Sequence, residues 1–147
     1  MSVQAVEKVK SMKVADVMKP TLDFIDGRAT VSEAVRLMRK LRESYLLVNR
    51  RDHDDAWGIV VRKDVVNKVI DPGKDPDDVS VFEIMTRPLI MVSPGLALKY
   101  CARLMHRAGI RRAPVFDGKN LVGIITNSDI FLALDVGKEV PAVRPKW

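Results

Sequence analysis

The sequence repeats itself, and an internal repeat constrains the fold of this 147-residue chain more than any other feature. Segment 58–65 reads GIVVRKDV, and segment 123–130, which begins 65 residues later, reads GIITNSDI. Sliding the chain by 67 residues superimposes two apolar patterns, each with the spacing of one buried helix face. The patterns comprise Val31, Ala34, Val35, Met38 and Leu41, and then Leu98, Cys101, Ala102, Met105 and Ala108. Both halves therefore predict the same amphipathic helix.

Local signals delimit these helices and the hairpins after them. Thr30 and Glu33 have the spacing of a capping box at the start of the first helix, and Gly109 suits the left-handed residue that ends the second. Two apolar runs joined by a polar turn follow each helix, SYLLVNR to WGIVV and RRAPVFD to LVGIIT, and they predict β-hairpins. A shorter helix, KDVVNKVI or SDIFLAL, comes next. Each repeat is therefore expected to run strand, helix, strand, strand, helix.

The repeats suggest how the chain is divided. We expect a first repeat at 14–70, a linker rich in Pro, Gly and Asp at 71–80, a second repeat at 81–134, and a basic tail at 135–147. A unit of about 60 residues is only marginally stable alone. The predicted fold is therefore α+β, with two β-α-β-β-α repeats packed with pseudo-twofold symmetry and clefts between them.

Composition and charge restrict the class of protein. The chain is 47% hydrophobic and 30% charged, as is typical of a soluble globular protein, and no apolar run approaches the roughly 20 residues of a membrane-spanning helix. The N-terminal segment lacks the apolar block of a signal peptide, and the single cysteine, Cys101, cannot form an internal disulfide. We therefore expect a cytoplasmic protein without membrane association. The net charge of +6 favours anionic partners, but basic and acidic residues are interleaved, which argues against nucleic acid.

A short polar segment lies where a predicted strand of the second repeat passes into a helix. It consists of Thr126, Asn127, Ser128 and Asp129. Backbone N–H groups at a helix start attract anions, hydroxyl groups can donate to a phosphate, and a carboxylate can accept hydrogen bonds from two ribose hydroxyls. Thr126 and Asp129 also have the spacing of a capping-box variant, and Gly123 suits close packing within a strand. From the residues alone, helix capping and ligand binding are both open interpretations.

The repeat and its motifs resemble a pair of cystathionine-β-synthase (CBS) domains, the regulatory unit called a Bateman module. The resemblance extends over residues 14–134 and rests on DVMKP, GIRRAPV and GIITNSD. It implies that Gly123, Thr126 and Asp129 form a nucleotide signature, in which Asp129 holds the ribose while Thr126 and Ser128, with Asn127 between them, approach the phosphates. It also implies a segment that borders the base and phosphates, namely Arg111, Arg112, Ala113 and Pro114.

The first repeat keeps only part of this signature. Gly58 and Asp64 are retained, whereas Val61 stands in place of the threonine, and Arg62 and Lys63 replace the Asn-Ser pair. Asp64 could bind a ribose, and Arg62 or Lys63 a phosphate, but capping and surface roles fit these residues equally well. We therefore expect one well-formed cleft and one degraded or differently selective cleft.

With the resemblance, the sequence predicts a stand-alone, non-enzymatic regulatory protein that binds AMP, ADP or ATP between its repeats and signals through a conformational change. S-adenosylmethionine is an alternative ligand, and no cofactor is required. His53 and His106 have no partners at metal-ligand spacing, so no metal site is expected. The resemblance also implies a homodimer and a regulated protein of unknown identity. Two alternatives stay open: an interaction module whose clefts have lost their ligand, and a basic nucleic-acid-binding protein.

Overall fold

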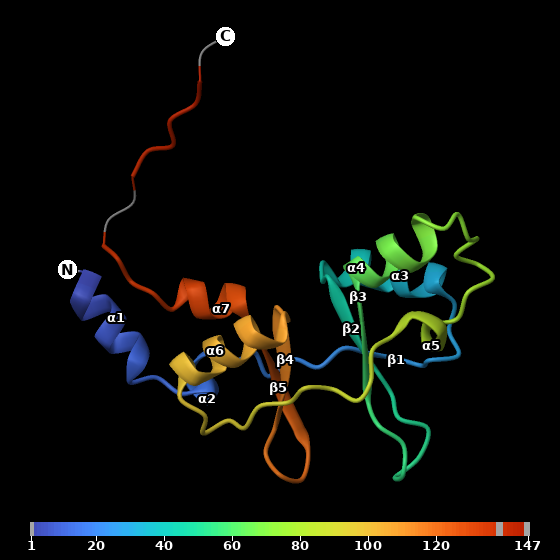
Figure 1. Cartoon of the computed structure of the whole chain (residues 1–147), viewed down its shortest axis with the longest axis horizontal. Helices are drawn as coiled ribbons and strands as arrows, with labels where there is room; N and C mark the ends of the chain where they lie inside the picture. Colours follow the sequence, from blue (N-terminus) through green and yellow to red (C-terminus); the bar gives the residue numbers. More distant parts are fainter. Residues whose placement is uncertain (1, 138–139, 146–147) are drawn as a thin grey trace. The chain divides into compact units, whose positions relative to one another are not determined.

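The computed structural model describes residues 2–137 and 140–145, and Figure 1 shows it coloured along the chain. The helices are α1 (Ser2–Lys10), α2 (Val14–Val17), α3 (Val31–Leu41), α4 (Arg62–Val65), α5 (Val81–Ile84), α6 (Leu98–Ala108) and α7 (Asn127–Leu132), with a π-helical turn, η1 (Val66–Ile70), after α4. The strands are β1 (Phe24–Ile25), β2 (Tyr45–Val48), β3 (Gly58–Val61), β4 (Arg112–Phe116) and β5 (Leu121–Thr126). This element order confirms the predicted α+β class. In the described part of the chain, no helix is long and apolar enough to cross a membrane.

The chain forms two compact units that exchange short segments between the repeats. Unit 1 contains Met1–Pro20 and Val92–Trp147, and unit 2 contains Thr21–Met91. Helix α2 therefore packs in the core of the second repeat and α5 in the core of the first, and the side chains of Val14 and Val81 are fully buried there. The repeats predicted at 14–70 and 81–134 are stretches of sequence, whereas each compact unit combines the opening helix of one repeat with the remainder of the other.

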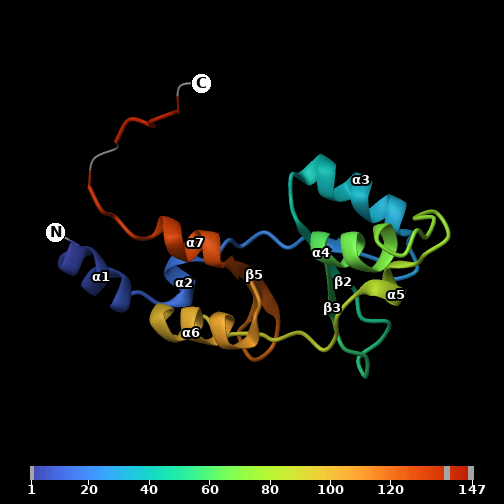
Figure 2. The ribbon, with the colours of Figure 1, turned by 45° about the horizontal axis from the view of Figure 1, so that its top comes forward.

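Unit 2 is built on a three-stranded sheet in the order β1-β2-β3. Strand β1 pairs in parallel with β2, Phe24 opposite Leu47, and β2 and β3 form the predicted antiparallel hairpin, Tyr45 opposite Val61. Every residue of β2 is buried, and α3 contributes its predicted apolar face to the same core. The helices α3, α4 and α5 of this unit can be followed in Figure 2.

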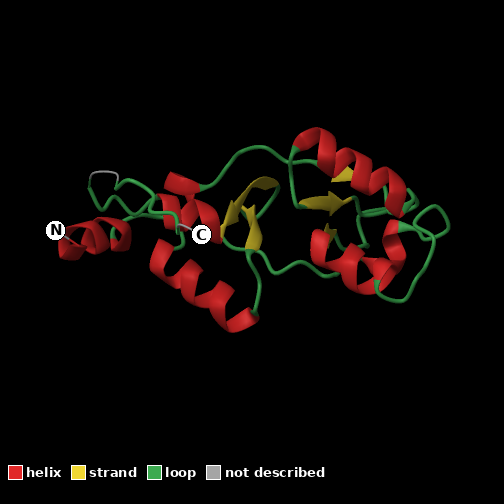
Figure 3. Cartoon of the chain, turned by 90° about the horizontal axis from the view of Figure 1, so that it is seen from above, coloured by secondary structure: helices red, strands yellow, loops and turns green. Residues whose placement is uncertain are grey.

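Unit 1 has a two-stranded sheet, β4-β5, which is the second predicted hairpin. The strand expected at the start of this repeat is reduced to one residue, Val92, which forms a parallel bridge with Val115. Pro94 follows two residues later and has no N–H with which to extend the ladder. Helix α6 provides the buried face, and α1 packs beside it with Ala5 buried. Figure 3 distinguishes the strands from the helices in both units.

The capping signals act as the sequence predicts. Thr30 Oγ1 accepts the backbone N–H of Glu33 at 3.1 Å, and the Glu33 carboxylate accepts that of Thr30 at 3.0 Å, so the α3 capping box is confirmed. Gly109 ends α6 in the left-handed region with φ of 67°, also as predicted. The equivalent residue after α3 is Arg42, which adopts a φ of 55° although it is not glycine.

Candidate functional site

The glycine of the repeated motif is required by a close approach of two backbones. Lys19 and Ile124 exchange two backbone hydrogen bonds of 2.9 Å, which hold the segment after α2 against β5. A Cβ atom at Gly123 would lie 2.5 Å from the Lys19 carbonyl oxygen. Gly58 is similar, since a Cβ there would lie 2.7 Å from Met85 Sδ. Close packing within the strand therefore accounts for Gly123.

The junction between β5 and α7 is a complete capping box. Thr126 Oγ1 accepts the backbone N–H of Asp129 at 3.0 Å, and Asp129 Oδ2 accepts the N–H of Thr126 at 3.1 Å. Asp129 is 9% exposed, so the cap removes most of the carboxylate from water. The capping interpretation of this segment is confirmed, and it occupies one of the two carboxylate oxygens.

The other oxygen of Asp129 faces a lysine from a distant part of the chain. Lys19 Nζ lies 3.6 Å from Asp129 Oδ1, and the lysine side chain is 60% exposed. An ion pair of this length with one exposed partner contributes little to folding stability. Within the described part of the chain, the partner of Asp129 Oδ1 is therefore an exposed side chain that can move into solvent.

The first repeat has a similar arrangement around Asp64, with a shorter ion pair. Asp64 Oδ2 accepts the backbone N–H of Val61 at 3.0 Å, but valine has no hydroxyl to complete the capping box. Lys68 Nζ lies 3.1 Å from Asp64 Oδ1 and also donates to the Ile84 carbonyl at 2.8 Å. Both oxygens of the buried Asp64 are therefore occupied by groups that are themselves fixed.

The remaining predicted residues of the second repeat take different positions around the junction. Asn127 and Ser128 are exposed in the first turn of α7, and the Asn127 N–H donates to the Arg111 carbonyl at 2.8 Å. Arg112 is half-buried on β4 opposite Thr126. Ala113 and Pro114 are buried within β4 and present little surface to a ligand.

A pocket of about 330 Å³ lies beside this junction within unit 1. Arg111 and Asn127 line it together with Met105, His106 and Gly109 from the end of α6. The structure therefore brings two predicted residues into one pocket, while Thr126, Ser128, Asp129 and the β4 residues are outside its lining. His106 and Gly109 were missed as pocket residues because their relation to Asn127 depends on the packing of α6 against α7.

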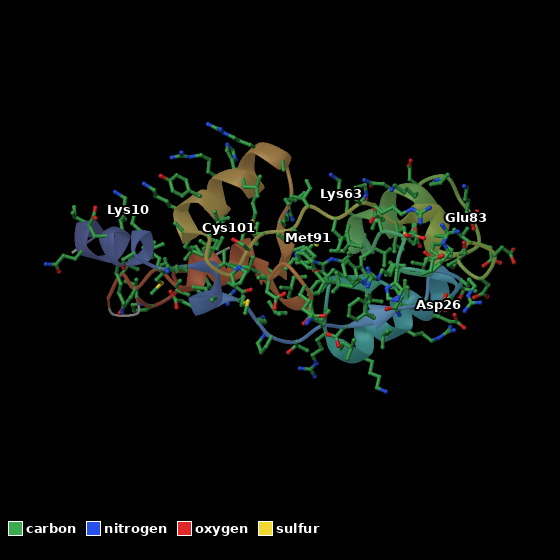
Figure 4. The ribbon with its side chains drawn as sticks, turned by 90° about the horizontal axis from the view of Figure 1, so that it is seen from below. Lys10, Asp26, Lys63, Glu83, Met91 and Cys101 are labelled. Carbon is green, nitrogen blue, oxygen red and sulfur yellow. The ribbon has the colours of Figure 1, made fainter. Side chains whose placement is uncertain are left out.

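The predicted cations of the first repeat are exposed at the start of α4. The Arg62 N–H donates to the Ser44 carbonyl at 2.9 Å, as Asn127 does to Arg111 in unit 1. Lys63, labelled in Figure 4, lies at the surface of unit 2. The two junctions therefore share their backbone connections and differ in side-chain charge.

Metal ligands and a reactive thiol are not evident in the described residues. Among residues 2–137 and 140–145, no group of three or more His, Cys, Asp or Glu side chains is arranged to hold a metal ion. Cys101, labelled in Figure 4, is fully buried on α6, and burial raises the pKa of its thiol above the ordinary range. Its position fits the small core residue predicted from the repeat.

The fold and its junctions define a class: a tandem α+β repeat in which each copy ends in a strand, an aspartate-capped turn and a short helix. The chain belongs to the CBS domain family, whose model, described as CBS domain, matches residues 14–71 and 81–136. The predicted resemblance to a CBS pair is therefore confirmed.

Known proteins of similar sequence and structure include one that is described as a CBS protein. An uncharacterized protein from Methanopyrus kandleri is 36% identical over 127 residues, which are 83% of this chain and 62% of the relative. The structure of a hexameric CBS-CP12 protein from bloom-forming cyanobacteria is 42% identical with a TM-score of 0.78, over 82% of this chain and 71% of that one. An uncharacterized conserved protein from Pyrococcus horikoshii is 28% identical with a TM-score of 0.77, over 90% and 98%. The chain thus spans less than two thirds of the Methanopyrus relative.

Proposed function

We propose that this CBS pair is a regulatory module that binds an adenine nucleotide, AMP, ADP or ATP, with S-adenosylmethionine as the alternative ligand. Asp129 is the ribose acceptor in this proposal. The observation that carries it is the unequal use of the Asp129 oxygens. Oδ2 serves the helix cap, whereas the partner of Oδ1 among residues 2–137 and 140–145 is the exposed Lys19 at 3.6 Å. A ribose can take Oδ1 from Lys19 without dismantling the cap.

The groups around Asp129 suit a sugar phosphate. The Ser128 hydroxyl and the Asn127 amide are exposed donors in the same turn, and the Arg111 side chain is exposed beside them. Lys19, once displaced from Asp129, is a further cation for the phosphates. Thr126 contributes through the cap, because its hydroxyl fixes the backbone on which Asp129 is mounted.

The equivalent site of the first repeat is the weaker one. A ligand at Asp64 would have to displace Lys68, whose ammonium is also held by the Ile84 carbonyl. Arg62 and Lys63 supply charge for a phosphate at the helix start but not for a ribose. We therefore rank Asp129 above Asp64 as a ribose acceptor.

The ligand acts by shifting a conformational equilibrium rather than by undergoing a reaction. Binding can favour one arrangement of the module only to the extent that the ligand binds that arrangement more tightly. The module works as a homodimer and passes its state to a separate protein.

A ligand-free interaction module is the second candidate. It is favoured by the fact that both junction carboxylates already have a cap and an ion pair within the protein. A nucleic-acid-binding role is supported only by the net charge of +6 and would show affinity that falls steeply with salt.

A thermal-shift and calorimetric panel tests the proposal. AMP, ADP, ATP, S-adenosylmethionine and GTP are added to the full chain, each with and without Mg²⁺. At 100 times the dissociation constant, one site stabilises the protein by roughly 2.7 kcal/mol, which raises Tm by about 5–10 °C.

The discriminating variants are Asp129→Asn and its matched control Asp64→Asn. The amide oxygen can still accept the capping N–H, so both variants should fold, but only Asp129→Asn should remove most of the nucleotide response. If no ligand of the panel changes the Tm of the parent protein or gives a binding heat, the interaction module is supported. Equal effects of the two substitutions contradict the ranking of the sites.

A further inference from the structure

We infer that unit 2 contains a second binding site, separate from the Asp129 junction, which takes a small phosphate monoester with an apolar body. The site is a pocket of about 580 Å³, bordered by the C-terminal end of α3, the turn at residues 42–44, and α4 with η1. This volume falls within the range typical of small-molecule sites. The proposal does not depend on the nucleotide site of unit 1.

The lining of this pocket combines positive charge with apolar side chains. Three exposed arginines, Arg39, Arg42 and Arg62, line it, and Glu43 is its one acidic residue. The apolar lining includes Met38 and Val65, which are buried, and Ile70, which is 65% exposed. A ligand that uses both parts must carry an anionic head and an apolar body.

The three guanidinium groups are not neutralised by the protein. Among the described residues, no carboxylate lies within ion-pair distance of any of them. Nor do they reflect a general basic excess, because Thr21–Met91 contains 12 basic and 13 acidic residues and has a formal charge of −1. The positive charge is therefore concentrated at the pocket within a nearly neutral unit.

Helix stability explains one of these arginines but not the other two. A cation in the last turn of α3 interacts favourably with the helix dipole, which accounts for Arg39. Arg42 adopts a left-handed φ of 55°, where glycine is the unstrained choice. Arg62 opens α4, where the helix dipole disfavours a positive charge. Two of the three arginines thus stand where they weaken the local structure.

The duplicated pocket in unit 1 shows what the same position contains without this charge. All eight residues that line the unit 1 pocket occupy the repeat-equivalent positions of the unit 2 pocket. The counterparts of Arg39, Arg42 and Arg62 are His106, Gly109 and Asn127. The arginine that lines the unit 1 pocket is Arg111, whose repeat-equivalent in unit 2 is Ser44. The unit 1 pocket is also smaller, about 330 Å³ against about 580 Å³. Only the pocket of unit 2 therefore has a rim of several guanidinium groups.

The geometry points to a phosphate monoester. A guanidinium holds a phosphate through two parallel hydrogen bonds, and a dianionic head can use more than one guanidinium at once. The same chemistry occurs in a free phosphorylated metabolite and in a phosphatidate headgroup, which an experiment can separate.

The test is a calorimetric titration of the full chain with phenyl phosphate, which has an apolar ring and a dianionic head. Phenyl phosphate should bind more tightly than inorganic phosphate, which lacks the apolar body, and phenol, which lacks the charge, should not bind. The triple variant Arg39→His/Arg42→Gly/Arg62→Asn installs the residues of unit 1. Loss of one charge-assisted contact weakens binding about tenfold or more, so the triple variant should show no measurable binding.

Arg36→His is the matched control, because Arg36 is exposed on α3 but does not line the pocket. It should change the affinity for phenyl phosphate less than about twofold, since a surface charge outside the site acts only through screened Coulomb forces. Arg42→Gly is the folding control, because glycine relieves the left-handed strain and should not lower Tm. Asp129→Asn should leave phenyl phosphate binding intact, so this proposal and the nucleotide proposal can fail separately.

Vesicles of phosphatidylcholine, with and without phosphatidate, form the second arm. Cosedimentation only with phosphatidate, lost in the triple variant, supports the same site with a lipid source. The proposal is overturned if neither phenyl phosphate nor phosphatidate vesicles bind, or if the triple variant binds like the parent. It is also overturned if Arg42→Gly changes the oligomeric state while anion binding is unaffected, because a second copy of the chain would then cover the pocket.

Discussion

Replacing Gly123 by alanine tests whether the motif glycine is fixed by the backbone of the preceding segment. The new Cβ would lie 2.5 Å from the Lys19 carbonyl oxygen, a backbone atom that cannot rotate away. The substitution should therefore break the two hydrogen bonds between Lys19 and Ile124, each worth about 1 kcal/mol net, and add about 1 kcal/mol of overpacking. The expected loss of about 3 kcal/mol corresponds to a decrease in Tm of roughly 10 °C, measured by thermal and urea denaturation.

Two other glycines of the chain calibrate this result. At Gly95 no heavy atom of the described residues, apart from the glycine and its chain neighbours, lies within 4 Å of the position of a new Cβ. Gly95→Ala should therefore change stability by less than about 1 kcal/mol. At Gly58 the nearest atom is the flexible Met85 Sδ, with the Thr86 carbonyl oxygen at 3.2 Å, and Gly58→Ala should be intermediate, about 1–2 kcal/mol. If Gly123→Ala melts at the same temperature as Gly95→Ala, the close approach does not constrain this position.

Three further predictions concern the helix cap at Thr126, the loss of folding stability at acid pH through Asp26, and the reactivity of the Cys101 thiol. Thr126→Ala should destabilise the protein by about 1 kcal/mol in urea denaturation, because the N–H of Asp129 loses its acceptor; an unchanged midpoint would contradict this. The pairing with Arg28 lowers the pKa of Asp26 from 3.8 to about 2, so its contribution to stability is complete above pH 3.8 and is lost as the pH falls through about 2. Asp26→Asn should flatten that part of the pH profile, and an equally steep decline would refute the assignment. Cys101, with its raised thiol pKa, should react with iodoacetamide only on unfolding, and rapid alkylation of the native protein would show that the thiol is accessible.

Local patterns predict much of the fold because they act over a few residues. The capping box of Thr30 and Glu33 and the left-handed Gly109 each depend on neighbours within one helical turn, and the structure has both. The hairpins follow from alternating apolar runs around polar turns. The strand at Val92 is shorter than predicted because periodicity does not register the missing N–H of Pro94.

Long-range contacts escape this kind of prediction. The exchange of α2 and α5 between the repeats depends on burial of Val14 and Val81 against residues far along the chain. The approach of Lys19 to Asp129 could not be predicted either, because 110 positions separate them and no sequence pattern links the two residues. The aspartate itself was found because the repeat placed it in a recognisable turn.

The positions of Lys19 and Lys68 in the chain suggest how nucleotide binding at the junctions could be transmitted. Lys68 is four residues from Asp64 on the same helical segment and also donates to the Ile84 carbonyl, so both of its partners belong to unit 2. Lys19 instead belongs to the segment that follows α2, and its backbone is hydrogen-bonded to Ile124. The next residue, Pro20, is the last residue of unit 1 before unit 2 begins. A ligand that binds Asp129 Oδ1 therefore displaces the side chain of Lys19, which lies on the chain segment leading from unit 1 into unit 2. Lys68 and Ile84 both lie within unit 2, away from the segment at Pro20, so a ligand at Asp64 would displace a contact inside one unit. This difference gives a physical reason for the second repeat, rather than the first, to be the one that responds.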